Sequence, residues 1–254
     1  MTRVIKTVKE WNELYKSENL SASQLGFVPT MGALHRGHAS LIEKSVADNR
    51  KTAVSIFVNP TQFNDSNDLQ KYPKTFKEDF AMLEKYNVDF LFFPSYEELY
   101  ADKFAYQVHE NSFSKILCGA FRSGHFDGVL TVVLKLLIII KPGRAYFGEK
   151  DYQQYKLIKG MAEAFFLQTE IIACPTVRDE DGLALSSRNL LLSPEEREFA
   201  LNFPRLLKAN KSCDEIKFEL EHLGFKVDYI EEYDGRRLGA VYAGKVRLID
   251  NVKL

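Results

Sequence analysis

The chain has 254 residues, of which 45% are hydrophobic, so it can bury one large core, or one core and a small second domain. Its 34 Lys and Arg residues nearly balance 35 Asp and Glu residues, and no basic stripe supports binding to nucleic acid. The only long apolar run, residues 129–140, contains Lys135 and is well short of the roughly 20 residues needed to cross a bilayer. We therefore expect a buried helix there, and neither nucleic acid nor membrane as a partner.

The cysteines indicate a reducing compartment. Cys118, Cys174 and Cys213 are an odd number without close spacing, which is typical of reduced packing residues in a cytoplasmic protein. A reactive cysteine is the alternative. The first six residues lack the apolar core of a signal peptide, so we expect a cytoplasmic location.

Strand-like apolar runs alternate with helical patterns up to residue 174. Strands are predicted at 25–28, 53–58, 88–93, 145–147 and 170–173, and helices at 39–49, 75–86, 127–141 and 152–166. This alternation predicts an α/β fold, with a parallel sheet covered by helices on both faces. In such sheets, ligands bind beyond the carboxyl ends of the strands.

The pattern changes after Pro175, where we predict a domain boundary. A charged helix is expected at about 194–210 and another at 213–223, followed by short strands at 226–230 and 246–249. The predicted domains are thus residues 1–175 and residues 176–254, the second a small α/β domain. Its position would allow residues 186–188 to close over a ligand, as lid segments do.

Residues 27–38, F-V-P-T-M-G-A-L-H-R-G-H, follow the first predicted strand. Gly32 lets the backbone approach a ligand, and Gly37 and His38 open the next helical segment. The unpaired N–H groups of a helix start favour an anion. His35 and His38 flank this start, so both can donate hydrogen bonds to one phosphate. The pattern suits the binding and cleavage of a nucleoside triphosphate.

Two other interpretations of these histidines stay open on spacing alone. An H-x-x-H pattern also occurs in ordinary loops, where the histidines are solvated or packed. A zinc site would need a third and usually a fourth ligand, and no nearby cysteine pair or H-E-x-x-H pattern supplies one.

Residues 29–38, P-T-M-G-A-L-H-R-G-H, resemble the HxGH signature of nucleotidyltransferases, and more closely a motif of the pantoate–beta-alanine ligase family. Three further segments resemble that family's motifs in the expected order: S-I-F-V-N-P-T-Q-F at 55–63, F-G-E-K-D-Y-Q-Q at 147–154 and L-S-S-R-N at 185–189. The resemblance continues more weakly through 227–229 and 247–251. It implies a Rossmann-like domain that binds ATP and pantoate, and a small C-terminal α/β lid domain.

The resemblance also implies a reaction. Pantoate and beta-alanine would be condensed to pantothenate with release of AMP and pyrophosphate, through a pantoyl-adenylate intermediate. The chain would then be a ligase that forms a C–N bond, with pantoate, beta-alanine and ATP as its ligands. A homodimer is implied by the resemblance only.

The family resemblance assigns roles to individual residues. His38 would be the proton donor, with His35 and Lys150 as the other catalytic residues. Gln62, Gln154 and Asn59 would bind pantoate and beta-alanine, because uncharged amides orient a carboxylate without placing a full positive charge on the attacking oxygen. The implied ATP-binding residues are Met31, Gly32, Ala33, Leu34, His35, Arg36, Gly37, His38, Gly148, Glu149, Lys150, Asp151, Val177, Leu185, Ser186, Ser187 and Arg188.

Magnesium is expected because the phosphates of ATP carry it, often with few protein ligands. Asp79 is a candidate ligand by analogy, and the alternative, which we favour slightly, is a carboxylate on a helix surface. His125 lies in G-H-F-D-G at 124–128, a segment expected to cover the pantoate pocket, and it is given no catalytic part. His109 and His222 lie outside every motif and are expected to be structural or solvated.

Two competing functions follow from the same motifs. Another nucleotidyltransferase of the superfamily would share the histidines but would need cationic contacts to its acceptor in place of Gln62 and Gln154. A non-catalytic nucleotide-binding protein would keep the fold without turnover, and the intact set of His, Gln, Lys, Ser and Arg residues argues against it.

Overall fold

The computed structural model describes residues 1–64, 69–70 and 72–254. The chain divides into two compact units: one contains Met1–Gly148 and Gln153–Cys174, and the other contains Glu149–Tyr152 and Pro175–Leu254. The sequence prediction put residues 149–152 in the first domain, whereas the structure groups them with the C-terminal residues. Lys150 therefore belongs to the second unit, not to the first domain as predicted.

The first unit is built on a six-stranded sheet in the order β1-β4-β3-β2-β5-β6. Every neighbouring pair is parallel, which confirms the predicted fold class. The chain runs from β2 outward through β3 to β4 and then returns to β5 on the other side of β2. The strands are β1 Arg3–Ile5, β2 Leu25–Thr30, β3 Lys51–Ile56, β4 Phe90–Phe92, β5 Arg144–Gly148 and β6 Glu170–Cys174.

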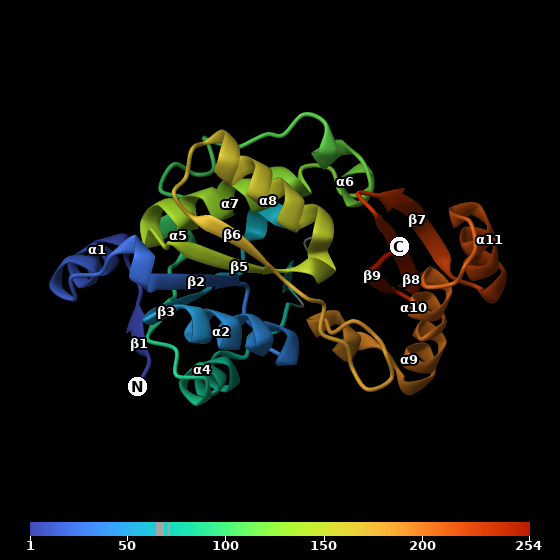
Figure 1. Cartoon of the computed structure of the whole chain (residues 1–254), viewed down its shortest axis with the longest axis horizontal. Helices are drawn as coiled ribbons and strands as arrows, with labels where there is room; N and C mark the ends of the chain where they lie inside the picture. Colours follow the sequence, from blue (N-terminus) through green and yellow to red (C-terminus); the bar gives the residue numbers. More distant parts are fainter. Residues whose placement is uncertain (65–68, 71) are drawn as a thin grey trace. The chain divides into compact units, whose positions relative to one another are not determined.

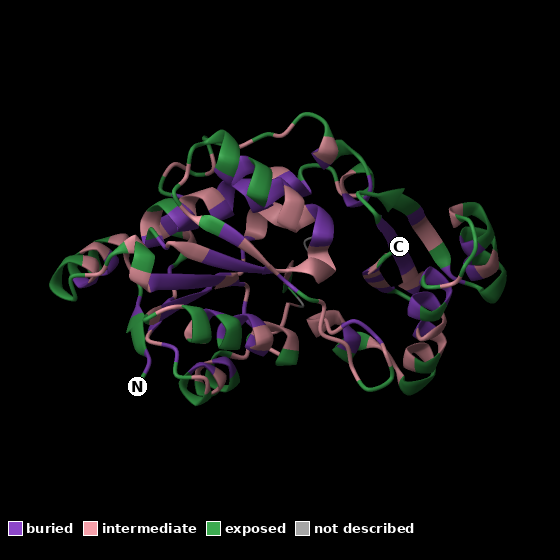
Figure 2. Ribbon diagram, viewed as in Figure 1, coloured by how far each residue is buried: buried purple, intermediate pink, exposed green. Residues whose placement is uncertain are grey.

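Helices cover both faces of this sheet, with α2 and α4 on one side and α7 and α8 on the other (Figure 1). The α2 and α4 side buries an aliphatic cluster that includes Val28, Leu41, Val54 and Leu83. The central strands are therefore buried over nearly their whole length, as β2 shows (Figure 2). The helices are α1 Val8–Ser17, α2 Arg36–Asp48, α4 Phe76–Lys85, α5 Tyr96–Leu99, α6 Cys118–Phe121, α7 His125–Ile140 and α8 Tyr152–Ala164.

Helix α7 is the buried helix expected from the apolar run at 129–140. It ends where Lys141 adopts a left-handed conformation directly before Pro142. Among the helices that the structure describes, none combines the length and apolarity needed to cross a membrane. Cys118 and Cys174 are buried, as expected of packing residues.

The second unit contains an antiparallel sheet of β7 Lys226–Tyr233, β8 Arg236–Ala243 and β9 Val246–Lys253. Its core joins this sheet to helices α9 Pro194–Ala200, α10 Asn202–Leu207 and α11 Cys213–Leu223. Gly239 is required in β8, because a Cβ there would lie 2.9 Å from the ring of Phe203. A glycine therefore lets α10 pack closely on the strand.

The structure differs from the sequence prediction at several elements, and helices α1, α5 and α6 were not predicted. The single helix predicted at 194–210 is two helices, because Pro204 is tolerated only in the first turn of a helix and so α10 restarts after Leu201. Strand β8 was not predicted, since it begins with two arginines and is interrupted by Gly239. Strand β1 is only three residues long and pairs with distant β4.

Candidate active site

Two motifs of the first unit follow the carboxyl ends of adjacent strands, and a third motif includes the last residue of a strand beside them. Residues 31–38 follow β2, residues 57–62 follow its neighbour β3, and Gly148 ends β5 on the other side of β2. The chain reverses its direction of travel across the sheet between β2 and β5, which is where open α/β sheets bind ligands. The motifs of β2 and β3 thus share one edge of the sheet, as the sequence predicted.

A tight turn after β2 is held by Asp79 of α4. Gly32 and Ala33 both have positive φ, at 80° and 51°. The Asp79 carboxylate accepts the Ala33 N–H at 3.0 Å and the Leu34 N–H at 2.7 Å. Asp79 is 3% exposed, so the expectation of a surface carboxylate was wrong. Its hydrogen bonds stabilise a backbone conformation that is unfavourable for Ala33.

The two histidines form a reciprocal cap at the start of α2. His35 is the N-cap residue, and its Nδ1 accepts the Gly37 N–H at 3.1 Å. His38 occupies the third position of the helix, and its Nδ1 accepts the His35 N–H at 3.3 Å. A backbone N–H only donates, so each Nδ1 carries a lone pair and each neutral ring carries its proton on Nε2. The caps therefore leave Nε2–H as the donor of both rings.

Gln62 lies in a 3₁₀ turn, Pro60–Gln62, and the side chains of Thr61 and Gln62 both bond to Asn59, which precedes it. Gln62 Oε1 accepts from Asn59 Nδ2 at 3.1 Å, and Gln62 Nε2 contacts the sulfur of Met31 at 3.1 Å. An amide nitrogen has two N–H donors, and the Met31 contact uses one of them. The bond from Asn59 thus fixes which end of the Gln62 amide is the donor.

Asn59 is a buried support for Gln62, with 1% exposure. It also donates to the carbonyl of Gly128 at 3.1 Å, and its Oδ1 accepts from Thr61 and from the Tyr100 hydroxyl. Burial raises the pKa of Tyr100 to about 12, so this hydroxyl stays protonated and donates. These contacts give Asn59 four protein partners, and its direct contact with a substrate stays a prediction.

The start of α7 packs beneath the same turn. His125 is buried, and its Nδ1 lies 2.8 Å from the Gln62 carbonyl oxygen, while its Nε2 lies 2.9 Å from Arg122. A carbonyl only accepts and a guanidinium only donates, so His125 is neutral with its proton on Nδ1. A Cβ on Gly128 would lie 2.5 Å from the Thr61 carbonyl oxygen. The backbones of α7 and the Gln62 turn are therefore in direct contact.

Two neighbouring glutamines on α8 have different surroundings. Gln153 is 4% exposed, and its amide binds the backbone N–H of Cys118 and the carbonyls of Phe113 and Ile116. Gln154, the predicted substrate-binding residue, is only partly buried. Gln153 is therefore structural, whereas the contact of Gln154 with a substrate stays a prediction.

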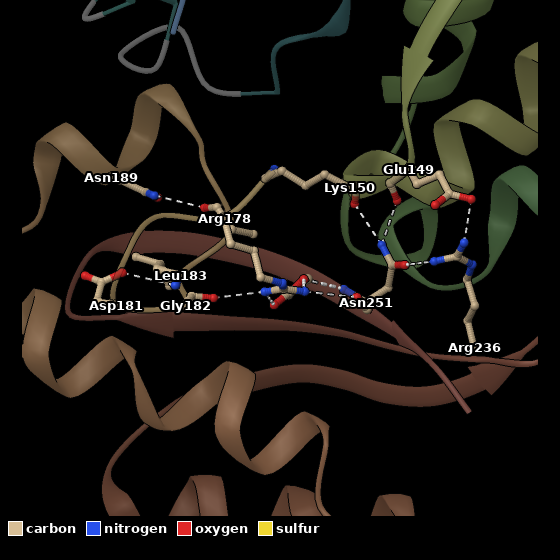
Figure 3. Close-up of polar contacts among 11 residues, drawn as sticks. Glu149, Lys150, Arg178, Asp181, Gly182, Leu183, Asn189, Arg236 and Asn251 are labelled. Atoms are coloured by element: carbon tan, nitrogen blue, oxygen red, sulfur yellow. Dashed lines mark hydrogen bonds and ion pairs between the residues drawn. The ribbon is translucent and has the colours of Figure 1, made fainter. Parts of the chain in front are cut away.

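Lys150 belongs to the second unit, in a 3₁₀ turn at Glu149–Asp151. Its ammonium lies 3.8 Å from the Asp151 carboxylate, and its side chain is 19% exposed. The Asn251 amide donates to the carbonyls of Glu149, at 2.8 Å, and Lys150, at 3.1 Å (Figure 3). The backbone that carries Lys150 is thus attached to strand β9.

The predicted phosphate loop lies in the same unit. Leu185 N–H donates to the carbonyl of Val177, and the Ser186 hydroxyl accepts the Arg188 N–H at 3.3 Å. Ser187 and Arg188 lie in the 3₁₀ turn Ser187–Leu191, and both are partly buried. The expectation that this loop and the motifs of the first unit share one crevice spans both units and stays a prediction.

The described residues do not form a metal-binding site made of protein ligands alone. Among them, no three His, Cys, Asp or Glu side chains group in a way that could hold a metal ion. Both carboxylate oxygens of Asp79 already accept backbone hydrogen bonds. A magnesium ion bound to the phosphates of ATP needs few protein ligands, and its binding here stays a prediction.

The sequence did not identify the residues that hold the Gln62 and Lys150 turns in place. Tyr100, Arg122 and Gly128 act on the Gln62 turn, and Asn251 acts on the Lys150 turn. The segment around His125 had been singled out, and so had residues 247–251. Neither pattern shows which backbone group such side chains would bind.

The class of protein follows from this architecture. A parallel α/β sheet with imidazole donors at a helix start after one strand, and an oriented amide after the next, is suited to nucleotide-dependent ligation or transfer. A family model described as pantoate-beta-alanine ligase matches residues 3–253.

Individual relatives agree over full length. The pantothenate synthetase of Coxiella burnetii (strain RSA 331 / Henzerling II) is 51% identical, covering 99% of this chain and 97% of its own length. That of Bdellovibrio bacteriovorus is 50% identical over 100% of both chains. The crystal structure of pantoate-beta-alanine ligase from Francisella tularensis, complexed with beta-gamma ATP and beta-alanine, has a TM-score of 0.94 at 43% identity and covers 100% of this chain and 98% of that one. The chain belongs to the pantoate–beta-alanine ligase family.

Proposed function

We propose that this chain condenses pantoate with beta-alanine, using ATP, to give pantothenate, AMP and pyrophosphate. Family membership supports the reaction, and the reciprocal histidine cap at the start of α2 is the structural observation that carries its mechanism. The carboxylate of pantoate is a poor electrophile, so it must first be activated. Its oxygen attacks the α-phosphorus of ATP, the bond to the β-phosphate oxygen breaks, and pyrophosphate leaves.

The second stage forms the amide. The amine of beta-alanine attacks the acyl carbon of pantoyl adenylate, loses a proton, and expels AMP as the C–O bond breaks. Gln154 and the remaining N–H of Gln62 would hold pantoate by its carboxylate and hydroxyl. A neutral amide holds the nucleophile in place without withdrawing its charge.

Negative charge builds on the α-phosphate and on pyrophosphate during the first stage, and its stabilisation is the main catalytic task. The Nε2–H groups of His35 and His38 are the donors proposed for the phosphates on the first unit. Lys150, Ser186, Ser187 and Arg188 are the donors proposed on the second unit. The remaining predicted ATP-binding residues, magnesium, a homodimer, a cytoplasmic location and a lid movement of the second unit belong to the same proposal.

The direct test is product formation by the purified chain. Pantothenate and AMP should accumulate in equal amounts when ATP, magnesium, pantoate and beta-alanine are all present. Exchange of labelled pyrophosphate into ATP should require pantoate and not beta-alanine. Exchange that depends on a phosphate-bearing acceptor would favour another nucleotidyltransferase, and ATP binding without AMP formation would favour a non-catalytic protein.

A further inference from the structure

The turn that carries Lys150 is bound to the C-terminal sheet by side chains rather than by strand pairing. Asn251 of β9 donates to two successive carbonyls, those of Glu149 and Lys150. The Arg236 guanidinium of β8 pairs with the Glu149 carboxylate at 2.5 Å. Tyr152, at the other end of the turn, donates its hydroxyl to Asp234. These contacts explain why residues 149–152 group with the second unit.

Asn251 itself has little freedom to reorient. It is 3% exposed, and its Oδ1 accepts from Arg236 Nη1 at 2.8 Å (Figure 3). A guanidinium only donates, so the oxygen of the amide must face Arg236 and the NH₂ group must face the two carbonyls. Arg236 is in turn 7% exposed and lies over the Tyr152 ring at 4.5 Å. The amide is thus locked in the orientation that holds the Lys150 backbone.

We infer that Asn251 is a positioning residue for Lys150 in adenylate formation. This inference rests on the proposed function, in which the Lys150 ammonium binds the phosphates of ATP. A fixed backbone limits the positions open to the long, flexible lysine side chain, and a misplacement of about 1 Å can cost about 10²-fold in rate. Asn251 fixes that backbone at the residue itself, through the carbonyl of Lys150.

The same strand also supports the other proposed phosphate-binding segment. Asp250, the neighbour of Asn251, forms a two-point ion pair with Arg178, at 2.7 and 2.9 Å. Arg178 donates to the carbonyl of Gly182, inside the turn that leads to Leu185 and the phosphate loop. Strand β9 contacts both 3₁₀ turns, at 149–151 and 187–191. Asp250 and Asn251, adjacent on β9, therefore bind the backbone of Lys150 and the arginine that contacts the turn before the phosphate loop.

The test uses Asn251→Asp in the full-length chain. The aspartate keeps the shape and the acceptor for Arg236, but it loses both N–H donors and turns a carboxylate oxygen toward the two carbonyls. We expect pantoate-dependent pyrophosphate exchange to fall about 10- to 100-fold with a raised KM for ATP. The KM for pantoate and the rate at which beta-alanine consumes preformed pantoyl adenylate should change little.

A double-mutant cycle with Lys150→Ala separates positioning from general destabilisation. If Asn251 acts through Lys150, the double variant should have nearly the same rate of pyrophosphate exchange as Lys150→Ala alone. Leu248→Ala is the control, because Leu248 lies on the same strand in the hydrophobic core of the unit. It should lower thermal stability while leaving the KM for ATP near that of the wild type.

Each outcome decides the inference. The inference would be overturned if Asn251→Asp exchanged pyrophosphate at the wild-type rate. It would also be overturned if the fold-loss of the double variant equalled the product of the two single fold-losses. If Asn251→Asp does not fold, Arg236→Lys replaces it, since it keeps the charge but cannot hold Asn251 and Glu149 together, and the same kinetics are expected. A wild-type chain without pantoate-dependent exchange would instead refute the proposed function.

Discussion

Replacing Gly128 by alanine should weaken pantoate binding, because the added methyl group displaces the turn that carries Gln62. Gly128 lies in the second turn of α7, directly against the turn that carries Gln62. An added Cβ would lie 2.5 Å from the Thr61 carbonyl oxygen and 2.8 Å from the Gln62 nitrogen. Both neighbours are backbone atoms, so no flexible side chain can move aside.

The displacement can be read from these distances. Ordinary van der Waals contact begins at 3.4 Å, so the Thr61 carbonyl must retreat by about 0.9 Å from its 2.5 Å approach. A shift of this size moves the Gln62 amide and strains the bond from Asn59 to the Gly128 carbonyl. Misplacement by about 1 Å costs about 10²-fold. We expect kcat/KM for pantoate to fall about 10- to 100-fold, with a much smaller change in the KM for ATP.

The assay is initial-rate kinetics with pantoate and ATP varied separately, together with thermal unfolding. Gly160→Ala is the matched control, because Gly160 also lies within a helix and a Cβ there would meet nothing within 4 Å. Alanine favours a helix by about 1 kcal/mol, so the control should unfold at the same or a higher temperature with normal kinetics. Normal pantoate kinetics in a folded Gly128→Ala chain would refute the reasoning, as would an equal loss in the control.

Three more variants test separate parts of the site. Asp79→Ala should lower stability by about 1–3 kcal/mol for each backbone N–H left without its acceptor and should raise the KM for ATP, with Asp79→Asn between it and the wild type; recovery of activity at high magnesium concentration would instead indicate a metal ligand. His38→Ala should retain the fold and ATP binding but lose about 10²–10⁴-fold in pyrophosphate release, and His38→Asn, whose Oδ1 can still cap the helix, should lose activity at nearly unchanged unfolding temperature; normal pyrophosphate release by either variant would contradict the assignment. Gln62→Ala should raise the pantoate requirement far more than the ATP requirement, and equal effects on both would count against its role.

The sequence predicted those parts of the molecule that depend on local patterns. The alternation of apolar strands and amphipathic helices gave the parallel sheet of the first unit, and the glycine turn and histidines at 32–38 were placed at a strand end. Strand β8 was not predicted because two arginines at its start are typical of a solvated segment. Both are buried: Arg236 pairs with Glu149, and Arg237 binds Glu232 and the carbonyls of a distant loop.

Long-range partners account for the other misses. Asp79 has the sequence setting of a surface carboxylate, and its burial depends on backbone N–H groups 45 residues away. Lys150 follows a strand of the first unit, and its attachment to Asn251 spans 101 residues. Local periodicity cannot predict such pairings, because each one joins residues that are far apart in the sequence and meet only in the folded chain.

The cap geometry also limits what the histidines can contribute to catalysis. Each Nδ1 accepts a backbone N–H, so a protonated ring would turn a donor toward a donor and lose its cap. The helix start therefore favours two neutral imidazoles, whose ring centroids lie 4.2 Å apart. Two positive rings at that distance would repel each other as well. His38 is thus better suited to stabilise phosphate charge by a hydrogen bond from Nε2 than to act as a preformed cation. Under the proposed function, the full positive charge would come from Lys150 and Arg188.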